Sequence, residues 1–449
     1  MTEVQTMRVL DLRGKNLSSI ELNLELPRAA VDISIAIEQI KPLLEDVKTR
    51  GVAAVVQVAI ERDGVDPQPL RVSQTELDVA LQNLDPELRE GIEESIARVR
   101  AVSEANLPES IEVEFAAGAK VIQRWRAVDS VGLYVPGGKA VYPSSVIMNV
   151  VPAQAAGVDR LVIATPAQKD FGGRPHPTVL ATAALLGVEE VLCVGGPAAV
   201  AAFAYGLSEI DFEPVNLVCG PGNIYVAAAK RALRGTIGID SEAGTTEIMV
   251  IADDSADPTF IAYDLVSQAE HDEAAASVLV TDSTELAQKV QQAVAKAAQA
   301  TSHSERVFTA LAGQQSAIVL VDSVAHAVKV ANDYATEHLE IQTENSHAVL
   351  AAISNAGAVF LGSYSPVSLG DYMAGSNHVL PTGQQAKFGS GLGVHTFLRA
   401  QQIIDYTKSG LAEISGKVQR FANAEGLPAH GEAVAIRFAN DSNGLSEEA

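Results

Sequence analysis

Cysteine and basic side chains are scarce in this 449-residue sequence. The two cysteines, Cys193 and Cys219, cannot form a disulfide framework in a chain of this length. Only 32 Lys and Arg stand against 56 Asp and Glu, which gives a net charge of −24. A field of this sign repels phosphate backbones and anionic lipid surfaces, so we expect no nucleic-acid partner and no membrane partner.

Long uninterrupted apolar runs are also lacking. Uncharged segments of membrane-spanning length occur, as at residues 191–208, but Gly195-Gly196-Pro197 breaks this one. The segment 1–17 mixes charged and apolar side chains and has no apolar core of the kind found in signal peptides. We therefore expect a soluble, cytoplasmic protein.

The composition is that of a globular protein, with 47% hydrophobic and 20% charged residues. At about 150 residues per domain, the length predicts roughly three domains. Residues 1–30 contain no complete periodic pattern, so we expect an N-terminal arm there. From residue 31 to about 105, apolar residues recur at three- and four-residue spacing, as in the segment 35–51, and this pattern predicts helices.

A repeated design follows these helices. Residues 155–166 (AAGVDRLVIATP) and 185–196 (LLGVEEVLCVGG) each combine a helix end closed by Gly-Val, two charged residues, a buried strand and a turn. Strands that alternate with helices at this period predict βαβ units in a parallel sheet, whose ligands bind beyond the carboxyl ends of the strands. The glycine-rich segments that should rim one such crevice follow Val135, Ile163, Val194 and Cys219.

The region 247–361 alternates again between strand-like and helical segments, which predicts a second α/β domain. We expect the helices of residues 31–105 to pack on this second domain. After Leu392 the chain becomes helical and loop-like, and its polar, acidic end at 440–449 is expected to be a disordered tail.

A standard dinucleotide-binding fingerprint, G-x-G-x-x-G after a strand, is absent. The segment 220–225 (GPGNIY) has the first two glycines and then Tyr225, and 391–396 (GLGVHT) has His395 where a small residue is needed. The crevice can still bind a nucleotide through backbone amides and helix N-termini. The alternative is that these glycine-rich segments form turns that are only structural and bind no nucleotide.

Several carboxylate, amide and imidazole side chains occur in suggestive pairs. Gln268 and His271 lie three residues apart on a predicted helix and so point to one face. Glu337 and His338 are adjacent, which suits a loop or a helix end. Two further pairs lie in glycine-containing loops: Asp371 with His378, and Glu425 with His430.

Such a set can support metal and proton-transfer chemistry. Zn²⁺ accepts nitrogen and oxygen ligands in tetrahedral sites, and catalytic sites keep one position open. A site of Gln, His, Asp and His has one anionic ligand, so the metal remains a strong Lewis acid for an alcohol or aldehyde oxygen. A nearby carboxylate and imidazole can then move protons near neutral pH. The spacing of these residues along the sequence is also compatible with polar loop residues that do not meet in a common site.

Cysteine offers a rival chemistry, because aldehyde oxidation can proceed through a thiohemiacetal. Cys219 lies directly before GPGN at the end of a predicted strand, but its flanks are apolar and no base is adjacent. Cys193 lies inside VLCVGG and has the context of a small core residue. We interpret both as buried, inert thiols.

Taken together, the sequence resembles the histidinol dehydrogenase family, the zinc enzymes that end histidine biosynthesis. The resemblance spans about residues 30 to 435, and its long motifs occur in the family's order. These motifs are VGLYVPGGKAVYPSSVIMNVVPAQAAGV, VCGPGNIYVAAAKR, GIDSEAGTTE, DLVSQAEHD, YATEHLEI and VFLGSYSPVSLGDYMAGSNHVLPT.

The resemblance implies an activity, its cofactors and a site. The family oxidises L-histidinol through the aldehyde to L-histidine and passes two hydrides to two NAD⁺. Glu337 and His338 would be the catalytic acid–base pair: His338 takes the alcohol proton, and Glu337 activates the water that adds to the aldehyde. One Zn²⁺ per subunit would be bound by Gln268, His271, Asp371 and His430.

The resemblance also implies the binding residues and the assembly. Tyr134 and Asn223 would line the NAD site. The chain would form a homodimer with shared active sites, to which Glu425 and His430 are donated across the interface. The substrate-binding set would be Thr246, Gln268, His271, His338, Asp371, His378, Glu425 and His430.

Two positions depart from the family's pattern. Ala198 stands where the family often has a glutamine that lines the cofactor pocket, which leaves the details of NAD affinity open. Thr246 stands where many members have serine, and it keeps the hydroxyl donor.

We therefore predict an α/β fold with two Rossmann-like sheet domains that lack G-x-G-x-x-G, an N-terminal arm and a small helical C-terminal domain. Two other functions remain open: a dehydrogenase of the same fold that acts on another polar alcohol, and a non-catalytic zinc-binding or assembly protein. The expected domains are an arm at 1–30, a metal-binding catalytic domain at 31–133 plus 247–390, an NAD-binding domain at 134–246, and a C-terminal dimerisation domain at 391–449.

Overall fold

The computed structural model describes residues 6–26, 28–29, 33–137, 140–242 and 244–441. The chain divides into two compact units. The first unit comprises Met1–Leu107 and Val128–Phe397, and the second comprises Pro108–Ala127 and Leu398–Ala449. The first unit contains two parallel sheets flanked by helices, so the predicted multidomain α/β class is confirmed.

The first sheet of this unit has six strands, all parallel. Its strands, in spatial order, are β1 (Arg8–Asp11), β11 (Ala317–Leu320), β10 (Ala276–Thr281), β9 (Glu247–Ala252), β12 (His338–Gln342) and β13 (Ala358–Leu361). Successive side chains of β9 alternate between two hydrophobic cores because both faces of the sheet are covered by helices.

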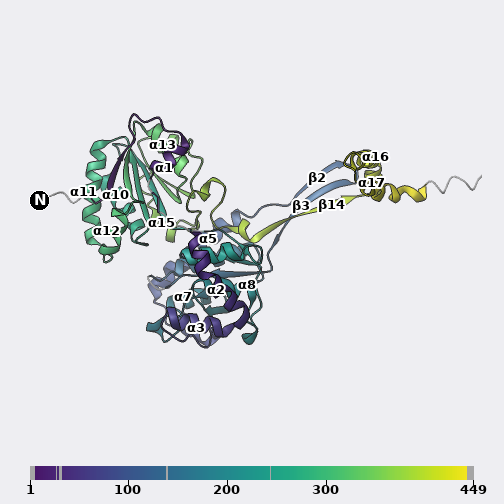
Figure 1. Cartoon of the computed structure of the whole chain (residues 1–449), viewed down its shortest axis with the longest axis horizontal. Helices are drawn as coiled ribbons and strands as arrows, with labels where there is room; N and C mark the ends of the chain where they lie inside the picture. The colour runs from purple at the N-terminus through teal and green to yellow at the C-terminus, as the bar shows by residue number, and fades with distance from the viewer. Residues whose placement is uncertain (1–5, 27, 30–32, 138–139, 243, 442–449) are drawn as a thin grey trace, which may run out of the picture. The chain divides into compact units, whose positions relative to one another are not determined.

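Different helices cover the two faces of this sheet (Figure 1). One face packs against α10 (Pro258–Ala269), α11 (Thr284–Ala300), α12 (Ser304–Ala312) and α15 (Val367–Tyr372). The other packs against α1 (Ser19–Glu25), α13 (Val324–Tyr334) and α14 (Ser346–Leu350). The helices α10, α13 and α15 lead directly into or out of the polar site described below.

The second sheet has five parallel strands. Its strands, in spatial order, are β6 (Glu190–Cys193), β5 (Arg160–Thr165), β4 (Ser130–Tyr134), β7 (Leu217–Cys219) and β8 (Gly238–Ile239). The strand order reverses between β4 and β7, and a reversal of this kind opens a crevice at the carboxyl ends of the two strands. The helices that connect the strands are α6 (Pro143–Ala155), α7 (Pro177–Leu185), α8 (Gly196–Tyr205) and α9 (Ile224–Leu233).

The early helices pack on this five-stranded half of the unit. They are α2 (Ile33–Arg50), α3 (Val52–Arg62), α4 (Gln74–Gln82) and α5 (Pro86–Ala105). Ile40, Leu44 and Val47 of α2 share a hydrophobic core with α8 and α9, while α4 packs on α7 and α5 on α6. We expected these helices on the other sheet. The placement differs because apolar periodicity identifies the buried face of a helix but not the sheet that buries it.

The stretch expected to be an N-terminal arm contains one strand of the first sheet and one helix that packs on a face of that sheet. Strand β1 pairs with β11, from which it is separated by about 300 residues of chain, and α1 packs on α13. Neither a four-residue strand nor a seven-residue helix is long enough to produce a clear periodic pattern.

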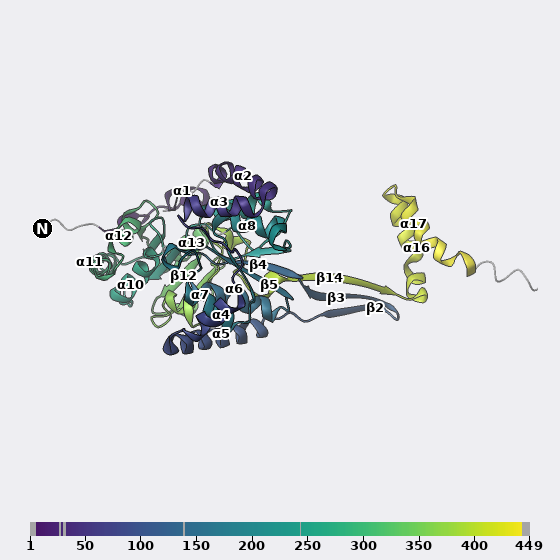
Figure 2. The same ribbon diagram turned by 90° about the horizontal axis from the view of Figure 1, so that it is seen from below.

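The second unit combines a three-stranded antiparallel sheet with C-terminal helices. Its strands β2 (Ile111–Ala116), β3 (Ala119–Ala127) and β14 (Leu398–Tyr406) lie side by side in the order β14-β3-β2 (Figure 2). The helices α16 (Lys408–Ala424) and α17 (Pro428–Ala435) pack on each other. We expected a C-terminal domain at 391–449 and placed residues 108–127 in the catalytic domain, whereas the C-terminal part of the second unit begins at Leu398 and the unit also contains the hairpin of β2 and β3. Most of the expected tail, residues 442–449, lies outside the described residues.

None of the helices in the described part of the chain is long and apolar enough to span a membrane.

We predict that Gly132→Ala destabilises the first unit. Gly132 is buried in β4, and an added Cβ would lie 2.5 Å from the ring of Phe203 on α8. Overpacking of this kind typically costs about 1–3 kcal/mol. Thermal unfolding followed by circular dichroism should show a lower Tm. As a control, Gly416→Ala in α16 meets no atom within 4 Å and should not lower the Tm; equal Tm values would contradict the expected clash.

Candidate active site

A cluster of buried polar groups lies at the amino ends of β9 and β12. These strands are parallel neighbours, and His338 pairs in register with Ile248. The residues just before the strands, Thr246 and Glu337, therefore meet beside Glu247. The sequence rule for parallel sheets points to the carboxyl ends of strands, so it gave no indication of this edge.

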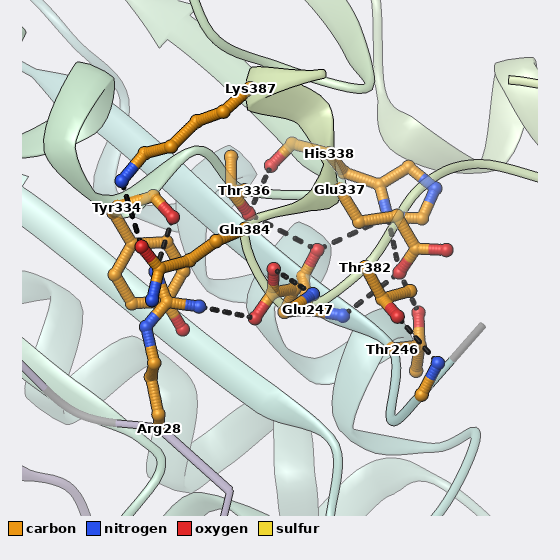
Figure 3. Close-up of polar contacts among 12 residues, drawn as sticks. Arg28, Thr246, Glu247, Tyr334, Thr336, Glu337, His338, Thr382, Gln384 and Lys387 are labelled. Atoms are coloured by element: carbon orange, nitrogen blue, oxygen red, sulfur yellow. Dashed lines mark hydrogen bonds and ion pairs between the residues drawn. The ribbon is translucent and has the colours of Figure 1, made fainter. Parts of the chain in front are cut away.

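The carboxylate of Glu337 is held by two donors. Thr246 Oγ1 donates to Glu337 Oε2 at 2.5 Å, and the backbone N–H of Glu247 donates to the same oxygen at 2.9 Å (Figure 3). Burial raises the pKa of Glu337 to about 7, although both hydrogen bonds act to lower it. A carboxyl group with this pKa can gain or lose a proton near neutral pH.

His338 is also held by residue 247. Its Nδ1 lies 3.3 Å from the backbone oxygen of Glu247 and 3.5 Å from Glu337 Oε2. If Nδ1 carries the hydrogen and donates it to the carbonyl, Nε2 is left as a proton acceptor. Burial lowers the pKa of His338, which favours the neutral imidazole that a general base requires.

Three of the expected metal ligands lie around this pair. Gln268, in the last turn of α10, is 1% exposed and donates through Nε2 to Thr246 Oγ1. His271 follows that helix and is exposed. Asp371 lies in α15. The charge of His271 lowers the pKa of Glu337 and that of Asp371 raises it, so both residues lie close enough to act on this cluster.

One observation supports the binding of a metal ion by these residues, namely a buried oxygen that has no hydrogen-bond partner. The Oε1 atom of Gln268 is buried and has no hydrogen-bond partner, an arrangement that is costly unless something else is bound there. An amide oxygen, an imidazole and a carboxylate are donors that Zn²⁺ accepts. Among the described residues, no group of three His, Cys, Asp or Glu side chains is arranged to hold a metal ion.

His378 connects the two halves of the first unit. Its Nδ1 lies 3.2 Å from the backbone oxygen of Asp371, and its Nε2 lies 3.2 Å from Oγ of Ser145 in the first turn of α6. Burial lowers the pKa of His378. Ser145 was not predicted to lie in the site, because a serine inside an apolar helical segment carries no distinctive pattern.

Glu425 and His430 lie in the second unit. Glu425 caps the C-terminus of α16 and His430 lies in α17, and both are exposed. Their expected contribution to a site with Gln268, His271 and Asp371 stays a prediction.

A cavity of about 1160 Å³ opens at the carboxyl ends of the five-stranded sheet. It is lined by the turns that follow β4, β5, β6 and β7, and by α2 and α3. The crevice expected from the glycine-rich segments is therefore present. The wall that α2 and α3 contribute was missed, because these helices were expected on the other sheet.

Tyr134 and Asn223, the expected cofactor residues, both line this cavity. The hydroxyl of Tyr134 accepts from the backbone N–H of Gly196 at 3.0 Å, and burial raises its pKa to about 12. Asn223 is the N-cap of α9 and accepts from two backbone amides of its first turn. Since α8 also begins at the cavity, two helix N-termini are available for the phosphates of a dinucleotide. Ala198, by contrast, is buried in the core of this half.

The turn after β7 is fixed by a buried ion pair that sequence analysis missed. Gly220 has φ +112°, and a Cβ there would lie 2.1 Å from the backbone oxygen of Tyr134. Lys230 Nζ donates to Gly220 O at 2.5 Å, and the backbone N–H of Gly220 donates to Asp240 Oδ2 at 2.8 Å. Lys230 and Asp240 also pair with each other at 2.6 Å. This arrangement holds Asn223 against the cavity.

Both cysteines are free and buried. Burial raises the pKa of Cys193 to about 12 and that of Cys219 well above its ordinary value. The thiolate is the reactive form, so neither thiol is suited to act as a nucleophile.

We predict that the folded protein resists alkylation. Because each raised pKa lowers the thiolate fraction at pH 8 and both sulfurs are buried, iodoacetamide should leave Cys193 and Cys219 unmodified under conditions that alkylate the unfolded chain completely. Intact-mass spectrometry of folded and urea-unfolded samples measures this. Rapid modification of Cys219 in the folded protein, with loss of activity, would contradict this prediction and support a reaction through a thiohemiacetal on Cys219.

Comparison with known proteins shows which protein family this chain is similar to. The family model described as histidinol dehydrogenase matches residues 26–438. Histidinol dehydrogenase of Bifidobacterium longum is 53% identical over 443 residues, covering 97% of this chain and 94% of that protein. The enzyme of the same name from Corynebacterium diphtheriae is 54% identical, with 97% and 98% covered. The crystal structure of histidinol dehydrogenase from Elizabethkingia anophelis matches with a TM-score of 0.90 at 30% identity, covering 98% of this chain and 99% of that one.

Proposed function

The chain belongs to the histidinol dehydrogenase family, and from this membership we propose that it oxidises L-histidinol through L-histidinaldehyde to L-histidine, with two NAD⁺ reduced in succession. The observation that carries the proposal is the buried pair Glu337 and His338, held by residues 246 and 247 beside the unpaired oxygen of Gln268. A non-catalytic zinc protein would have no need for such an acid–base pair.

The donor set supports a zinc ion beside this pair. Gln268, His271 and Asp371 would hold it, with His430 supplied by the second unit of a partner chain. Bound Zn²⁺ supplies Lewis acidity toward the alcohol and aldehyde oxygens. Asp371 would be the only anionic ligand of the four, so the positive charge at the site would be only partly neutralised.

His338 acts as the base for the alcohol. Its Nδ1 is directed to the backbone oxygen of Glu247, so Nε2 can accept the hydroxyl proton of the substrate. Because burial lowers the pKa of His338, the imidazole is neutral before the reaction.

Glu337 acts in the aldehyde stage. Its carboxylate would take a proton from the water that adds to the aldehyde, and a pKa of about 7 allows it to do so near neutral pH. The donors Thr246 and Glu247 N–H hold the carboxylate in one orientation, which reduces the entropy lost when water and aldehyde meet.

The remaining residues bind substrate and cofactor. His378 and Thr246 lie within the cluster and can hydrogen-bond the substrate, while Glu425 would pair with a cationic group of histidinol in a homodimer with shared sites. NAD⁺, the hydride acceptor, would occupy the cavity lined by Tyr134 and Asn223. We propose a cytoplasmic location for this biosynthetic enzyme.

We predict that two NADH form for each L-histidinol consumed. The two oxidations remove four electrons, and each NAD⁺ accepts two of them as a hydride. Absorbance at the NADH band, combined with chromatographic quantification of histidinol, aldehyde and histidine, measures the ratio. One NADH with accumulating aldehyde would contradict the four-electron reaction. Faster NAD⁺ reduction with another polar alcohol would identify a sister enzyme of the same fold.

We predict that His338→Asn slows alcohol oxidation by about 10²–10⁴-fold, the usual contribution of a general base. The zinc content should stay unchanged, because His338 is not among the proposed ligands. Steady-state rates with histidinol and metal analysis of the same sample test this. The matched control is His347→Asn on the exposed surface, which should leave the rate unchanged. Full turnover by His338→Asn would remove the role given to His338.

We predict that Glu337→Gln slows the oxidation of the aldehyde more than the oxidation of the alcohol. With L-histidinaldehyde supplied as substrate, the rate should fall by about 10²–10⁴-fold, because the amide cannot take a proton from water. The first oxidation should be affected less than the second. Single-turnover measurements that start from the alcohol and from the aldehyde compare the two stages. Equal losses in both would show that Glu337 does not act mainly on water.

A further inference from the structure

The main chain of residue 247 holds both catalytic side chains at once. Its N–H donates to Glu337 Oε2 at 2.9 Å, and its carbonyl oxygen lies 3.3 Å from His338 Nδ1. The same oxygen also accepts from Thr336 Oγ1. Any contact that fixes residue 247 therefore fixes the geometry of the acid–base pair.

The side chain of Glu247 is directed away from that pair. Its Oε2 lies 3.4 Å from Nη1 of Arg28, and its Oε1 accepts from the backbone N–H of Gly383 at 3.2 Å. Figure 3 shows Arg28 on the opposite side of Glu247 from His338. The Glu247 side chain is only 7% exposed, and burial raises its pKa to about 7, while the facing guanidinium of Arg28 acts to lower it and so favours the charged carboxylate.

Arg28 also holds the chain that leads into Glu337. Its Nη2 donates to the backbone oxygen of Tyr334, the last residue of α13, and its guanidinium carbon lies 3.8 Å from the centre of the Tyr334 ring. Tyr334 is three residues before Glu337. One guanidinium group thus contacts both the start of β9 and the turn between α13 and β12.

We propose that Arg28 is a positioning residue for the catalytic pair, acting through Glu247 and Tyr334. The inference rests on the proposed roles of Glu337 and His338. Removing the guanidinium takes away the cation that faces the buried carboxylate and the contact to Tyr334 O, and a buried charge that has lost its partner is driven toward solvent. Movement of the charged Glu247 side chain toward solvent shifts the main chain of residue 247 and, with it, the orientation of both catalytic groups.

The role proposed for residue 28 requires the shape of the arginine side chain as well as its positive charge. A planar guanidinium can donate to Glu247 and to Tyr334 O from separate nitrogens while it stacks on the Tyr334 ring, whereas a lysine ammonium is a compact point charge. Arg28→Lys should therefore recover only part of the activity lost in Arg28→Ala.

The test compares Arg28→Ala with the wild-type protein by two readouts. The first is steady-state kinetics with histidinol: kcat should fall about 10-fold or more, since a small misplacement of catalytic groups has an effect of this order, and KM should change little. Guanidinium chloride at millimolar concentration should restore part of kcat in the variant and not raise that of the wild type. The zinc content should be the same in both proteins.

The second readout needs no substrate. In protein labelled with ¹⁵N-histidine, the imidazole signals of His338, assigned by their loss in His338→Asn, should shift in Arg28→Ala because the hydrogen bond to Glu247 O is disturbed. This readout separates the inference from the proposed function. A wild-type protein that fails to oxidise histidinol counts against the function, while the His338 signal still decides the positioning role.

The matched control is Arg160→Ala. Arg160 pairs with Glu190 through two hydrogen bonds of 2.8 and 2.9 Å, and both side chains are 27% exposed. The pair lies at the amino ends of β5 and β6, whereas the cavity lies at their carboxyl ends. This variant loses an ion pair but should keep kcat, its response to guanidinium and the His338 signal unchanged.

A double variant guards against simple loss of folding. Glu247→Gln keeps the size of the side chain and removes its charge, so the loss of Arg28 should matter less in that background. Arg28→Ala combined with Glu247→Gln should therefore be more active than Arg28→Ala alone. Wild-type kcat and an unchanged His338 signal in Arg28→Ala, or strictly additive losses in the double variant, would overturn the proposal.

Discussion

The arrangement of Glu337 and His338, the proposed acid–base pair, depends on the main chain of one residue, Glu247. The parallel pairing of β9 and β12 presents its N–H to Glu337 and its carbonyl to His338. These backbone groups lie at the amino end of a central strand, in a sheet that is buried on both faces, so the pairing of the strands places them beside Glu337 and His338. The charged side chain on the same residue is the weak point of this arrangement, because a buried carboxylate requires a partner.

The two sheets of the first unit have their candidate sites at opposite ends of their strands. The five-stranded sheet uses the carboxyl ends of its strands, where the strand order reverses and the cavity opens. The six-stranded sheet uses the amino ends of β9 and β12, where buried groups with perturbed pKa values gather. The hydrogen bond between His378 and Ser145 connects these two regions. This division is consistent with a cofactor in one half and the proton-transfer residues in the other.

Much of this was predictable from sequence where the signal is local. The repeats at 155–166 and 185–196 identify β5 and β6 with their turns, and the pair Glu337 and His338 is recognised from motifs. The residues from distant parts of the chain that contact these motifs were not predictable from the sequence. Arg28 meets Glu247 across 219 residues of chain, and β1 meets β11 across a longer separation. No periodicity specifies such contacts, and the same limit explains why α2 and α3 were expected on the wrong sheet.

We propose that the unpaired Oε1 of Gln268, together with His271 and Asp371, belongs to a catalytic zinc site next to Glu337 and His338. The most direct test strips the purified protein with a chelator and follows zinc content and histidinol oxidation in the same sample. We expect one zinc ion per chain before treatment, loss of turnover in step with loss of zinc, and recovery when Zn²⁺ is returned. Full turnover by protein shown to be free of metal would contradict it.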